Sequence, residues 1–366
     1  MRVALIAPPF IPVPPKKYGG TELFVAQLAE GLQKQGIEVV VYTNGESTVG
    51  VEKRWLYEKQ QWPIEGEVFS NLTDINHSAW AIEDAVRHCD LIHVNSVPAI
   101  AMSRLISTPM VYTIHHVHEE MLSNFYAHYP NLEYVAISDF QRKLEKMPRM
   151  RTIHHGLDTN LYTWKGGKRE YLSFLGRIAP MKGPHLAIEV AKRSGIPLKI
   201  AGEIQPCFRE YWESQVKPHV DGKFIEYVGE ADMAAKNELL KNSVAMLFPI
   251  QWNEPFGLVM IEAMACGAPV VALSGGAVEE VVAEGVSGYV CKNVEEMAAR
   301  MKNAAALKAD DVRAYVEEKF STQRMAMEYA DLFRETIAAR ELLPSENEVN
   351  EADAMTNFAG ENSIVA

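Results

Sequence analysis

The chain has 366 residues, which suggests two domains of ordinary size, and 48% of them are hydrophobic, which is enough for two cores. Lys and Arg number 36 against 48 Asp and Glu, and the formal charge of −12 argues against nucleic acid as a partner. The four cysteines are widely spaced without a CxxC pair, which disfavours a disulfide framework or a zinc site and fits a reducing cytosol.

Short apolar runs alternate with amphipathic segments along the first part of the chain. We predict strands at 2–8, 38–43, 90–95, 109–115, 133–138 and 150–156, and helices at 21–36, 76–89 and 138–147. Such alternation is typical of a parallel sheet covered by helices on both faces. Residues 1–163 are therefore predicted to form one α/β domain.

A second series of the same kind follows a polar segment and predicts a second α/β domain over 164–320. We predict its strands at 170–176, 197–203, 223–229, 242–250 and 269–273, and its helices at 183–195, 234–243 and from Phe256–Gly257 onward. Residues 321–343 have the pattern of a long amphipathic helix, which we expect to pack back on the first domain. The acidic tail 344–366 has few large apolar residues and is predicted to be disordered.

Two Rossmann-like halves also suit dinucleotide enzymes and NTPases, but their phosphate loops are missing. No GxGxxG follows any predicted strand, and the first such loop reads YGGTE instead. A GxxxxGK[ST] loop is absent as well. Hydride transfer and NTP hydrolysis are therefore disfavoured.

Two glutamates flank the start of a predicted helix in "WNEPFGLVMIEAMACGAPVV". Glu254 lies in the loop after a strand, where α/β sheets bind ligands, and Glu262 lies about two turns into the helix. The helix N-terminus between them offers backbone amides to an anion. The pattern suits a ligand with a phosphate in its middle and a hydroxylated sugar at each end. The alternative is an acid at a helix N-terminus followed by an ordinary surface acid.

Two further loops at strand ends carry residues suited to phosphate. Gly19 and Gly20 in YGGTE permit close approach of the backbone to a ligand, although a flexible turn gives the same pattern. Arg177 and Lys182 in GRIAPMKGP supply two cations for a diphosphate, whose charge must be neutralised if it is to leave. A metal could do the same, but no Asp-x-Asp pair that would bind one lies in a suitable strand-end loop.

Three histidines follow another predicted strand in "TIHHVHEE". His115 is the first polar residue after the apolar run, so we expect it at the floor of a cleft between the domains. His116 and His118 come next, and so many histidines together raise the possibility of zinc. The spacing is not HExxH, and we favour a hydrogen bond from His115 to a sugar hydroxyl over a metal site.

Together these motifs resemble the family-4 retaining glycosyltransferases (glycosyl transferases group 1) of the GT-B fold. "EPFGLVMIEAMACGAPVV" is similar to their E-x7-E signature and "GRIAPMKG" to their Arg/Lys phosphate motif. The resemblance covers the predicted elements from residue 1 to about 340. It implies two Rossmann-like domains that face a central cleft, and transfer of a sugar from a nucleotide sugar with retention of its α configuration.

The resemblance also implies roles for individual residues. Catalysis would rest on His115, Arg177, Lys182 and Glu254. The donor would be bound by Gly19, Gly20, Arg177, Lys182, Gly202, Val228, Gly229, Glu254, Phe256, Gly257, Leu258 and Glu262. The acceptor would contact Asn95, His115 and His118. The family implies no metal or other cofactor, because cations hold the diphosphate and the leaving phosphate serves as the base.

The motifs also depart from the family pattern at two places. "HHGLD" (154–158) stands where many relatives have an Asn-Gly-Val-Asp turn, and "GGAVEE" (275–280) lacks the usual proline. A nucleotide-sugar epimerase and a nucleotide-sugar-binding protein without turnover remain as alternatives. Three classes of acceptor stay open, namely a glycan, a lipid-linked molecule and a small molecule.

We expect a UDP-sugar donor first and GDP-mannose next, because such donors are common. The expected location is the cytoplasm, since "MRVALIAPPF" has too short an apolar run for a signal peptide and no stretch approaches about 18 apolar residues. The basic segment 141–151 would permit peripheral contact with an anionic inner membrane face, although a solvated helix surface is the more usual meaning of such a segment.

Overall fold

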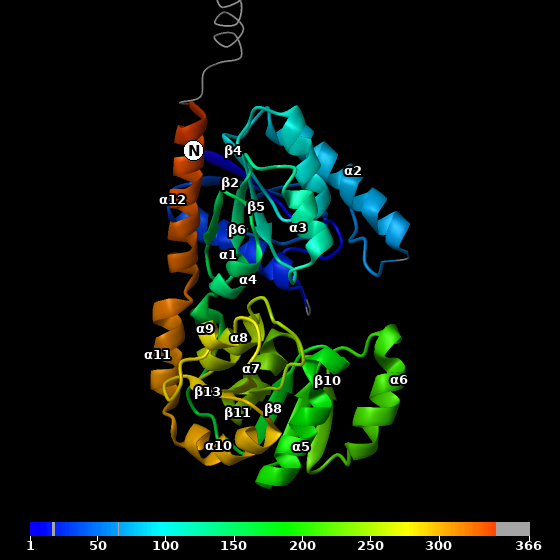
Figure 1. Ribbon diagram of the computed structural model, residues 1–366, viewed down its shortest axis with the longest axis vertical. Helices are drawn as coiled ribbons and strands as arrows, with labels where there is room; N and C mark the ends of the chain where they lie inside the picture. The colour runs from blue at the N-terminus through cyan, green and yellow to red at the C-terminus, as the bar shows by residue number, and fades with distance from the viewer. Residues whose placement is uncertain (17–18, 65, 342–366) are drawn as a thin grey trace, which may run out of the picture.

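The computed structural model describes residues 1–16, 19–64 and 66–341, which form two parallel β-sheets in two lobes. Figure 1 shows one lobe above the other, with the last two helices along one side. This confirms the predicted α/β architecture with two Rossmann-like sheets. Among the described helices, none combines the length and apolar composition needed to cross a membrane.

The first sheet has the strand order β3-β2-β1-β4-β5-β6-β7, and all of its pairs are parallel. Its strands are β1 (Arg2–Ile6), β2 (Glu38–Thr43), β3 (Glu52–Trp55), β4 (Leu91–Val94), β5 (Met110–Ile114), β6 (Glu133–Ala136) and β7 (Met150–Thr152). Its helices are α1 (Gly20–Lys34), α2 (Glu67–Ala85), α3 (Glu120–Tyr126) and α4 (Asp139–Leu144).

The second sheet has the order β10-β9-β8-β11-β12-β13 and is parallel as well. Its strands are β8 (Tyr171–Leu175), β9 (Leu198–Ala201), β10 (Ile225–Gly229), β11 (Ser243–Phe248), β12 (Val270–Leu273) and β13 (Gly288–Cys291). The helices that follow β7 are α5 (Pro184–Ser194), α6 (Arg209–Tyr211), α7 (Met233–Lys241), α8 (Leu258–Ala265), α9 (Val278–Val281), α10 (Val294–Ala306), α11 (Ala309–Lys319) and α12 (Thr322–Glu341).

Apolar side chains on both faces of each strand explain why helices cover both sides of the sheets. In β1, Val3 and Leu5 belong to one buried cluster, whereas Ala4 and Ile6 belong to another on the opposite face. Successive side chains of a strand point to opposite faces, so a strand buried on both sides needs a continuous apolar run. The run RVALI supplies it.

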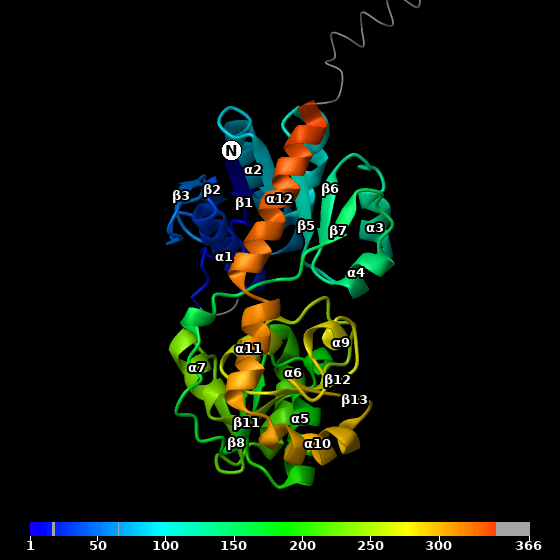
Figure 2. The ribbon, with the colours of Figure 1, turned by 90° about the vertical axis from the view of Figure 1, so that its left-hand side faces the viewer.

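The last helix, α12, crosses from the second lobe to the first and packs along α1, as Figure 2 shows. Gly31 of α1 lies so close to α12 that an added Cβ would come within 2.6 Å of the Ala326 Cβ. Tyr329 completes the contact, because its hydroxyl lies 2.9 Å from Thr113 Oγ1 in β5. The last described helix therefore packs on the first lobe and covers α1.

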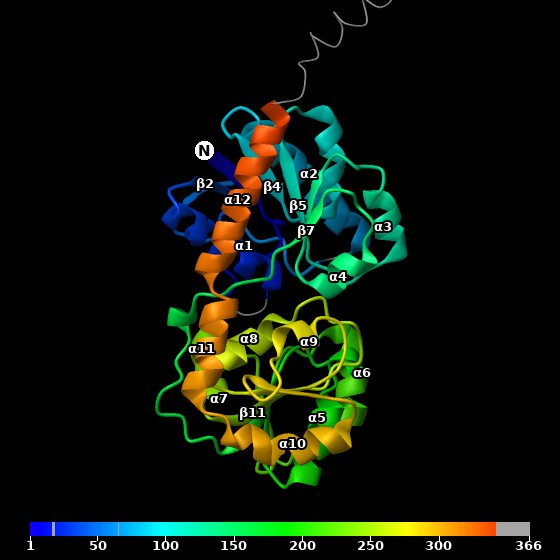
Figure 3. The same cartoon turned by 60° about the vertical axis from the view of Figure 1, so that its left-hand side comes forward.

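A second contact joins the lobes near the cleft. Figure 3 shows α4 and α9 facing each other across the gap between them. The Glu280 carboxylate accepts hydrogen bonds from the backbone amides of Asp139 (2.7 Å) and Phe140 (2.5 Å), and His154 Nε2 lies 3.0 Å from it. A carboxylate from one lobe therefore caps a helix of the other.

The observed elements differ from the predicted ones in three respects. α2 begins at Glu67, well before the predicted residue 76, and its first turns leave Val68 and Phe69 exposed. The strands β3 and β13 and the helices α3, α6, α9, α10 and α11 were not predicted. The predicted elements around 138–147 and 150–156 are shorter in the structure, where α4 ends at Leu144 and β7 ends at Thr152. The predictions for 344–366 lie outside the described residues.

Candidate active site

A pocket of about 300 Å³ opens between the two lobes, where loops at the carboxyl ends of strands from both sheets meet. Parallel sheets bind ligands at this edge, where the strand order reverses, and here that point lies beside β1 in one sheet and β8 in the other. The predicted site residues that line the pocket are Gly19, Gly20, His115, Arg177, Lys182, Gly202, Glu254, Phe256, Gly257, Leu258 and Glu262.

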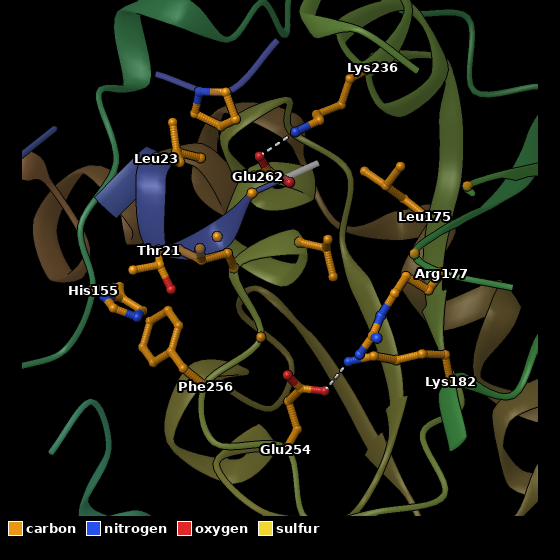
Figure 4. A pocket seen from close by; sticks show the side chains of 18 of the residues that line it. Thr21, Leu23, His155, Leu175, Arg177, Lys182, Lys236, Glu254, Phe256 and Glu262 are labelled. Atoms are coloured by element: carbon orange, nitrogen blue, oxygen red, sulfur yellow. Dashed lines mark hydrogen bonds and ion pairs between the residues drawn. The ribbon is translucent and has the colours of Figure 1, made fainter. Parts of the chain in front are cut away.

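Lys182 and Glu254 form an ion pair at one end of this pocket. Lys182 Nζ lies 2.6 Å from Glu254 Oε2, and Trp252 Nε1 donates a 2.8 Å hydrogen bond to the same oxygen. The ammonium group also stands 4.6 Å from the centre of the Trp252 ring, within range of a cation–π contact. Figure 4 shows Arg177 beside Lys182, on the same side of the pocket.

The backbone around Lys182 has little freedom. Gly183 adopts φ +71°, and an added Cβ would lie 2.0 Å from the carbonyl oxygen of Pro249. Only glycine fits such a left-handed position against a neighbouring backbone. The loop after β8 is thereby held against the end of β11, which places Lys182 opposite Glu254.

A second lysine–glutamate pair lies at the other end of the pocket, as Figure 4 shows. Lys236 of α7 lies 2.5 Å from Glu262 Oε1 in α8, and the Tyr162 hydroxyl donates a 2.9 Å hydrogen bond to the same oxygen. The Glu262 side chain is only 3% exposed, so its two donors are needed to offset the loss of water. Each glutamate predicted from the E-x7-E pattern is thus paired with a lysine.

Gly202 joins three loops beside the pocket. It has φ +155°, and an added Cβ would lie 1.8 Å from the carbonyl oxygen of Gly176. Its amide donates to Gly229 O (2.9 Å), and its carbonyl accepts from the Tyr227 hydroxyl (2.7 Å). The ends of β8, β9 and β10 are therefore packed closely around one glycine.

The first lobe contributes two stacked histidines. The rings of His115 and His155 are 5.7 Å apart and nearly parallel, and Phe24 packs against both. Burial, with His116 close by, lowers the pKa of His115 to about 3, and burial also brings the pKa of His155 well below its ordinary value. At neutral pH both rings are therefore uncharged and can exchange hydrogen bonds with hydroxyl groups.

The remaining predicted residues lie outside this pocket. Asn95 lies behind His115, where its Oδ1 is 2.8 Å from His115 Nε2. His118 lines a neighbouring cavity instead. Val228 is 42% exposed on the edge strand β10 and lines a separate hollow, and Gly229 reaches the site only through its bond to Gly202.

The three histidines of "TIHHVHEE" do not converge on one point. His115 bonds to Asn95, His116 Nε2 lies 2.5 Å from the Tyr126 hydroxyl, and His118 Nδ1 lies 2.9 Å from Glu145. In the part of the chain that the structure describes, the group with metal-ligand geometry is Asp139, His154 and Glu280, between the lobes. In this group, the Glu280 carboxylate already accepts hydrogen bonds from two backbone amides.

Sequence reasoning missed Lys236 and His155. Lys236 resembles a solvated charge on an amphipathic helix, and only the packing of α7 on α8 brings it to Glu262. His155 was noted as a departure from the family turn but not as a site residue. It is 4% exposed and lines the pocket, and its Nδ1 has no hydrogen-bond partner in the structure. That atom needs a partner, so a ligand is the natural source of one.

This fold and site define a glycosyltransferase of the GT-B type. The family model of glycosyl transferases group 1 matches residues 163–320, and that of glycosyltransferase family 4 matches residues 18–161. The chain belongs to the group 1 glycosyl transferases of the GT-B fold. The two matches together cover every strand of both sheets except β1.

Individual relatives and solved structures are similar to this chain over most of its length. Spore coat protein SA of Bacillus subtilis is 24% identical over 81% of this chain and 86% of its own length. Among solved structures, AviGT4, a glycosyltransferase involved in avilamycin A biosynthesis, has a TM-score of 0.71 and 24% identity over 92% of this chain and 98% of its own. HepE of Anabaena, solved with UDP-glucose, has a TM-score of 0.72 and 18% identity over 92% of this chain and 100% of its own.

Proposed function

We propose that this glycosyltransferase takes its sugar from a nucleoside-diphosphate sugar and forms an α-glycosidic bond with retention. The observation that carries the proposal is the pairing of Lys182 with Glu254 and of Lys236 with Glu262 at opposite ends of one pocket. Carboxylates accept hydrogen bonds from sugar hydroxyls, and the cations between and beside them attract phosphate. The site thus offers polar partners for a sugar at each end of a diphosphate.

Each group has a distinct task in this proposal. Arg177 and Lys182 bind the diphosphate and stabilise its charge as it departs, in the role that a divalent metal fills elsewhere. Glu254 accepts hydrogen bonds from the transferred sugar and stabilises the positive charge that develops on its ring. Glu262 and Lys236 bind the ribose hydroxyls.

The reaction that we propose needs no nucleophile from the protein. The acceptor hydroxyl oxygen bonds to C1 of the sugar while the bond from C1 to the diphosphate oxygen breaks on the same face. The hydroxyl proton passes to the departing phosphate oxygen. His115, which is uncharged at neutral pH, holds a sugar hydroxyl beside this centre.

UDP is the nucleotide that we favour, with GDP second. Structures of HepE, whose fold is similar, were solved with UDP and with UDP-glucose, which supports this choice. The backbone of Gly202, which is bonded to Gly229 at the end of β10, would frame the base. We place the reaction in the cytoplasm, which suits the four free cysteines.

The direct test is turnover of UDP-glucose with a panel of hydroxylated acceptors, followed by NMR of the product. The proposal predicts UDP release and an α-configured anomeric proton, with EDTA present. Lys182→Ala and Glu254→Gln should each reduce the rate by at least roughly a hundredfold, whereas the exposed Lys192→Ala should not. Full donor turnover in both site variants would contradict the proposal, and isomerised donor without transfer would identify an epimerase.

A further inference from the structure

A second cavity adjoins the donor pocket at Pro255, the residue after Glu254. It measures about 360 Å³ and lies between the 252–255 loop of the second lobe and the start of α4 in the first. Pro255 lines both cavities, and Trp252, which lines the second, donates a hydrogen bond to the Glu254 carboxylate in the first. A molecule held in this cavity, named here the side pocket, therefore lies next to the proposed reaction centre.

The walls of the side pocket are mainly apolar. Phe140, Leu144, Trp252 and Pro255 provide its apolar surface, and no Asp, Glu, Lys or Arg is found among the described residues that line it. Gln141 is a lining residue, but its amide is already bonded to backbone atoms of Ile137, Ile114 and His116. These walls favour an uncharged occupant with a flat apolar ring, because aromatic and apolar walls bind such groups most strongly.

One polar side chain of the side pocket is held in a fixed orientation. His118 Nδ1 lies 2.9 Å from Oε1 of Glu145, whose side chain is 1% exposed, and Ser123 Oγ lies 3.2 Å from the same nitrogen. An ionised carboxylate only accepts hydrogen bonds, so Glu145 places a proton on Nδ1. In the uncharged ring, the other nitrogen, Nε2, is therefore available to accept a hydrogen bond from a ligand.

We infer that the side pocket binds the body of the acceptor, which has a flat apolar ring and a hydrogen-bond donor that reaches His118 Nε2. The inference rests on the proposed function, because it assigns the acceptor side of that reaction. Glu145 acts as a positioning residue, since it touches His118 and not the acceptor. This arrangement holds the acceptor in both lobes at once, beside the sugar that it receives.

The first arm of the test measures binding of the ring. Ligand-observed NMR compares phenyl β-D-glucoside with methyl β-D-glucoside on the full chain, with saturating UDP to fill the donor pocket. We expect the phenyl compound to bind roughly tenfold more tightly, because its ring leaves water. Phe140→Ala and Leu144→Ala should each reduce this preference to within about twofold, whereas Leu161→Ala, at a remote and partly exposed leucine, should retain it.

The second arm tests how Glu145 orients His118. In ¹⁵N spectra of the histidine side chains, the wild-type protein should show His118 protonated on Nδ1, and Glu145→Gln should shift this signal towards the other tautomer. An unchanged tautomer would overturn the role of Glu145. Equal affinity for the two glucosides, or a preference that survives both pocket variants, would overturn the side pocket while leaving UDP binding intact. Failure of UDP to bind the wild-type protein would instead overturn the proposed function.

Discussion

Lys182 Nζ and Glu254 Oε2 are 2.6 Å apart at one end of the proposed site, and the same oxygen accepts a 2.8 Å hydrogen bond from the Trp252 indole N–H. The two side chains are largely buried, with exposures of 16% and 9%, so their attraction is screened little by water. A diphosphate that reaches Lys182 must therefore compete with Glu254 for the same cation. In the proposed reaction, this competition links donor binding to Glu254, the group assigned to the sugar.

The competition predicts opposite effects of Glu254→Gln on binding and on turnover. Removing the charge leaves Lys182 without its anionic partner, so UDP should bind roughly three- to tenfold more tightly, about 1 kcal/mol. Sugar transfer should fall at least roughly a hundredfold, because the developing positive charge loses its carboxylate. Calorimetry of UDP and a UDP-release assay measure the two effects. Weaker UDP binding in this variant would show that Glu254 does not compete with the diphosphate, and the exposed Glu38→Gln serves as the control.

His155→Asn tests whether the buried, unpartnered Nδ1 of His155 meets the donor sugar. The loss of one hydrogen bond should raise KM for UDP-glucose about tenfold, because about 1.4 kcal/mol corresponds to that factor. The Kd of UDP should change less than about twofold, since UDP lacks the sugar. His128→Asn, at an exposed histidine of the same lobe, is the matched control. An equal loss for UDP and UDP-glucose would place His155 against the nucleotide instead.

Glu22, at the start of α1, predicts a pH dependence of stability. Burial raises the pKa of Glu22 to about 7, although a hydrogen bond from its own backbone amide opposes the shift. Between pH 4.5 and 7 the unfolded chain has lost this proton while the folded chain keeps it, so the free energy of unfolding falls as pH rises, by up to about 3 kcal/mol. Above pH 7 the loss is complete and constant.

Glu22→Gln should remove this decline and make the protein more stable than wild type at pH 8. Melting temperatures across this pH range measure the effect, with Glu30→Gln on the same helix as the control. Parallel curves for wild type and Glu22→Gln would show that Glu22 is ionised in the folded protein throughout.

Glu280, which lies between the lobes, should make stability depend on pH in the opposite direction in the acid range. Burial by itself raises the pKa of Glu280, but hydrogen bonds from His154 and from the backbone of Asp139 and Phe140 outweigh it, so the pKa lies below its ordinary value of 4.5. The stabilisation is present above pH 4.5 and is lost as the pH falls through the lower, folded-state pKa. The melting temperature of Glu280→Gln should therefore fall less steeply in acid than that of the control, Glu279→Gln. An equally steep fall in both variants would contradict this prediction.

Gly202→Ala should damage the loop junction behind the pocket. Its new Cβ would lie 1.8 Å from Gly176 O, whereas at Gly222, which also has positive φ, nothing lies within 4 Å. We expect Gly202→Ala to cost at least about 2 kcal/mol of stability and Gly222→Ala about 1 kcal/mol, because only the first adds a clash to backbone strain. Urea unfolding of both variants checks this, and equal losses would show that the junction relaxes freely.

The E-x7-E and Arg/Lys motifs were predictable because their spacing is local. Each motif follows a strand whose apolar run is plain in the sequence, and parallel strands bring such positions to the same edge of the sheet. The residues placed in this way are Glu254, Glu262, Arg177 and Lys182. Val228 was expected at the pocket from the family resemblance, but β10 is the edge strand of its sheet and this side chain lies in a separate hollow.

What the sequence did not predict depends on contacts between distant segments. β3 has the sequence EKRW and lies at the edge of its sheet, so it lacks the apolar run of a central strand. His154 and Glu280 lie in the two motifs that depart from the family pattern, and only the fold shows that they meet across the lobes. A sequence read locally carries no sign of such a pair.

UDP binding in the presence of EDTA, for the wild-type protein and Lys182→Ala, is the most direct test of the central claim that fixed cations hold the diphosphate. A ligand that binds only the folded state raises the melting temperature. We expect a clear rise in melting temperature with UDP that EDTA leaves unchanged and that Lys182→Ala abolishes. A rise that disappears with EDTA, or that survives in Lys182→Ala, would contradict it.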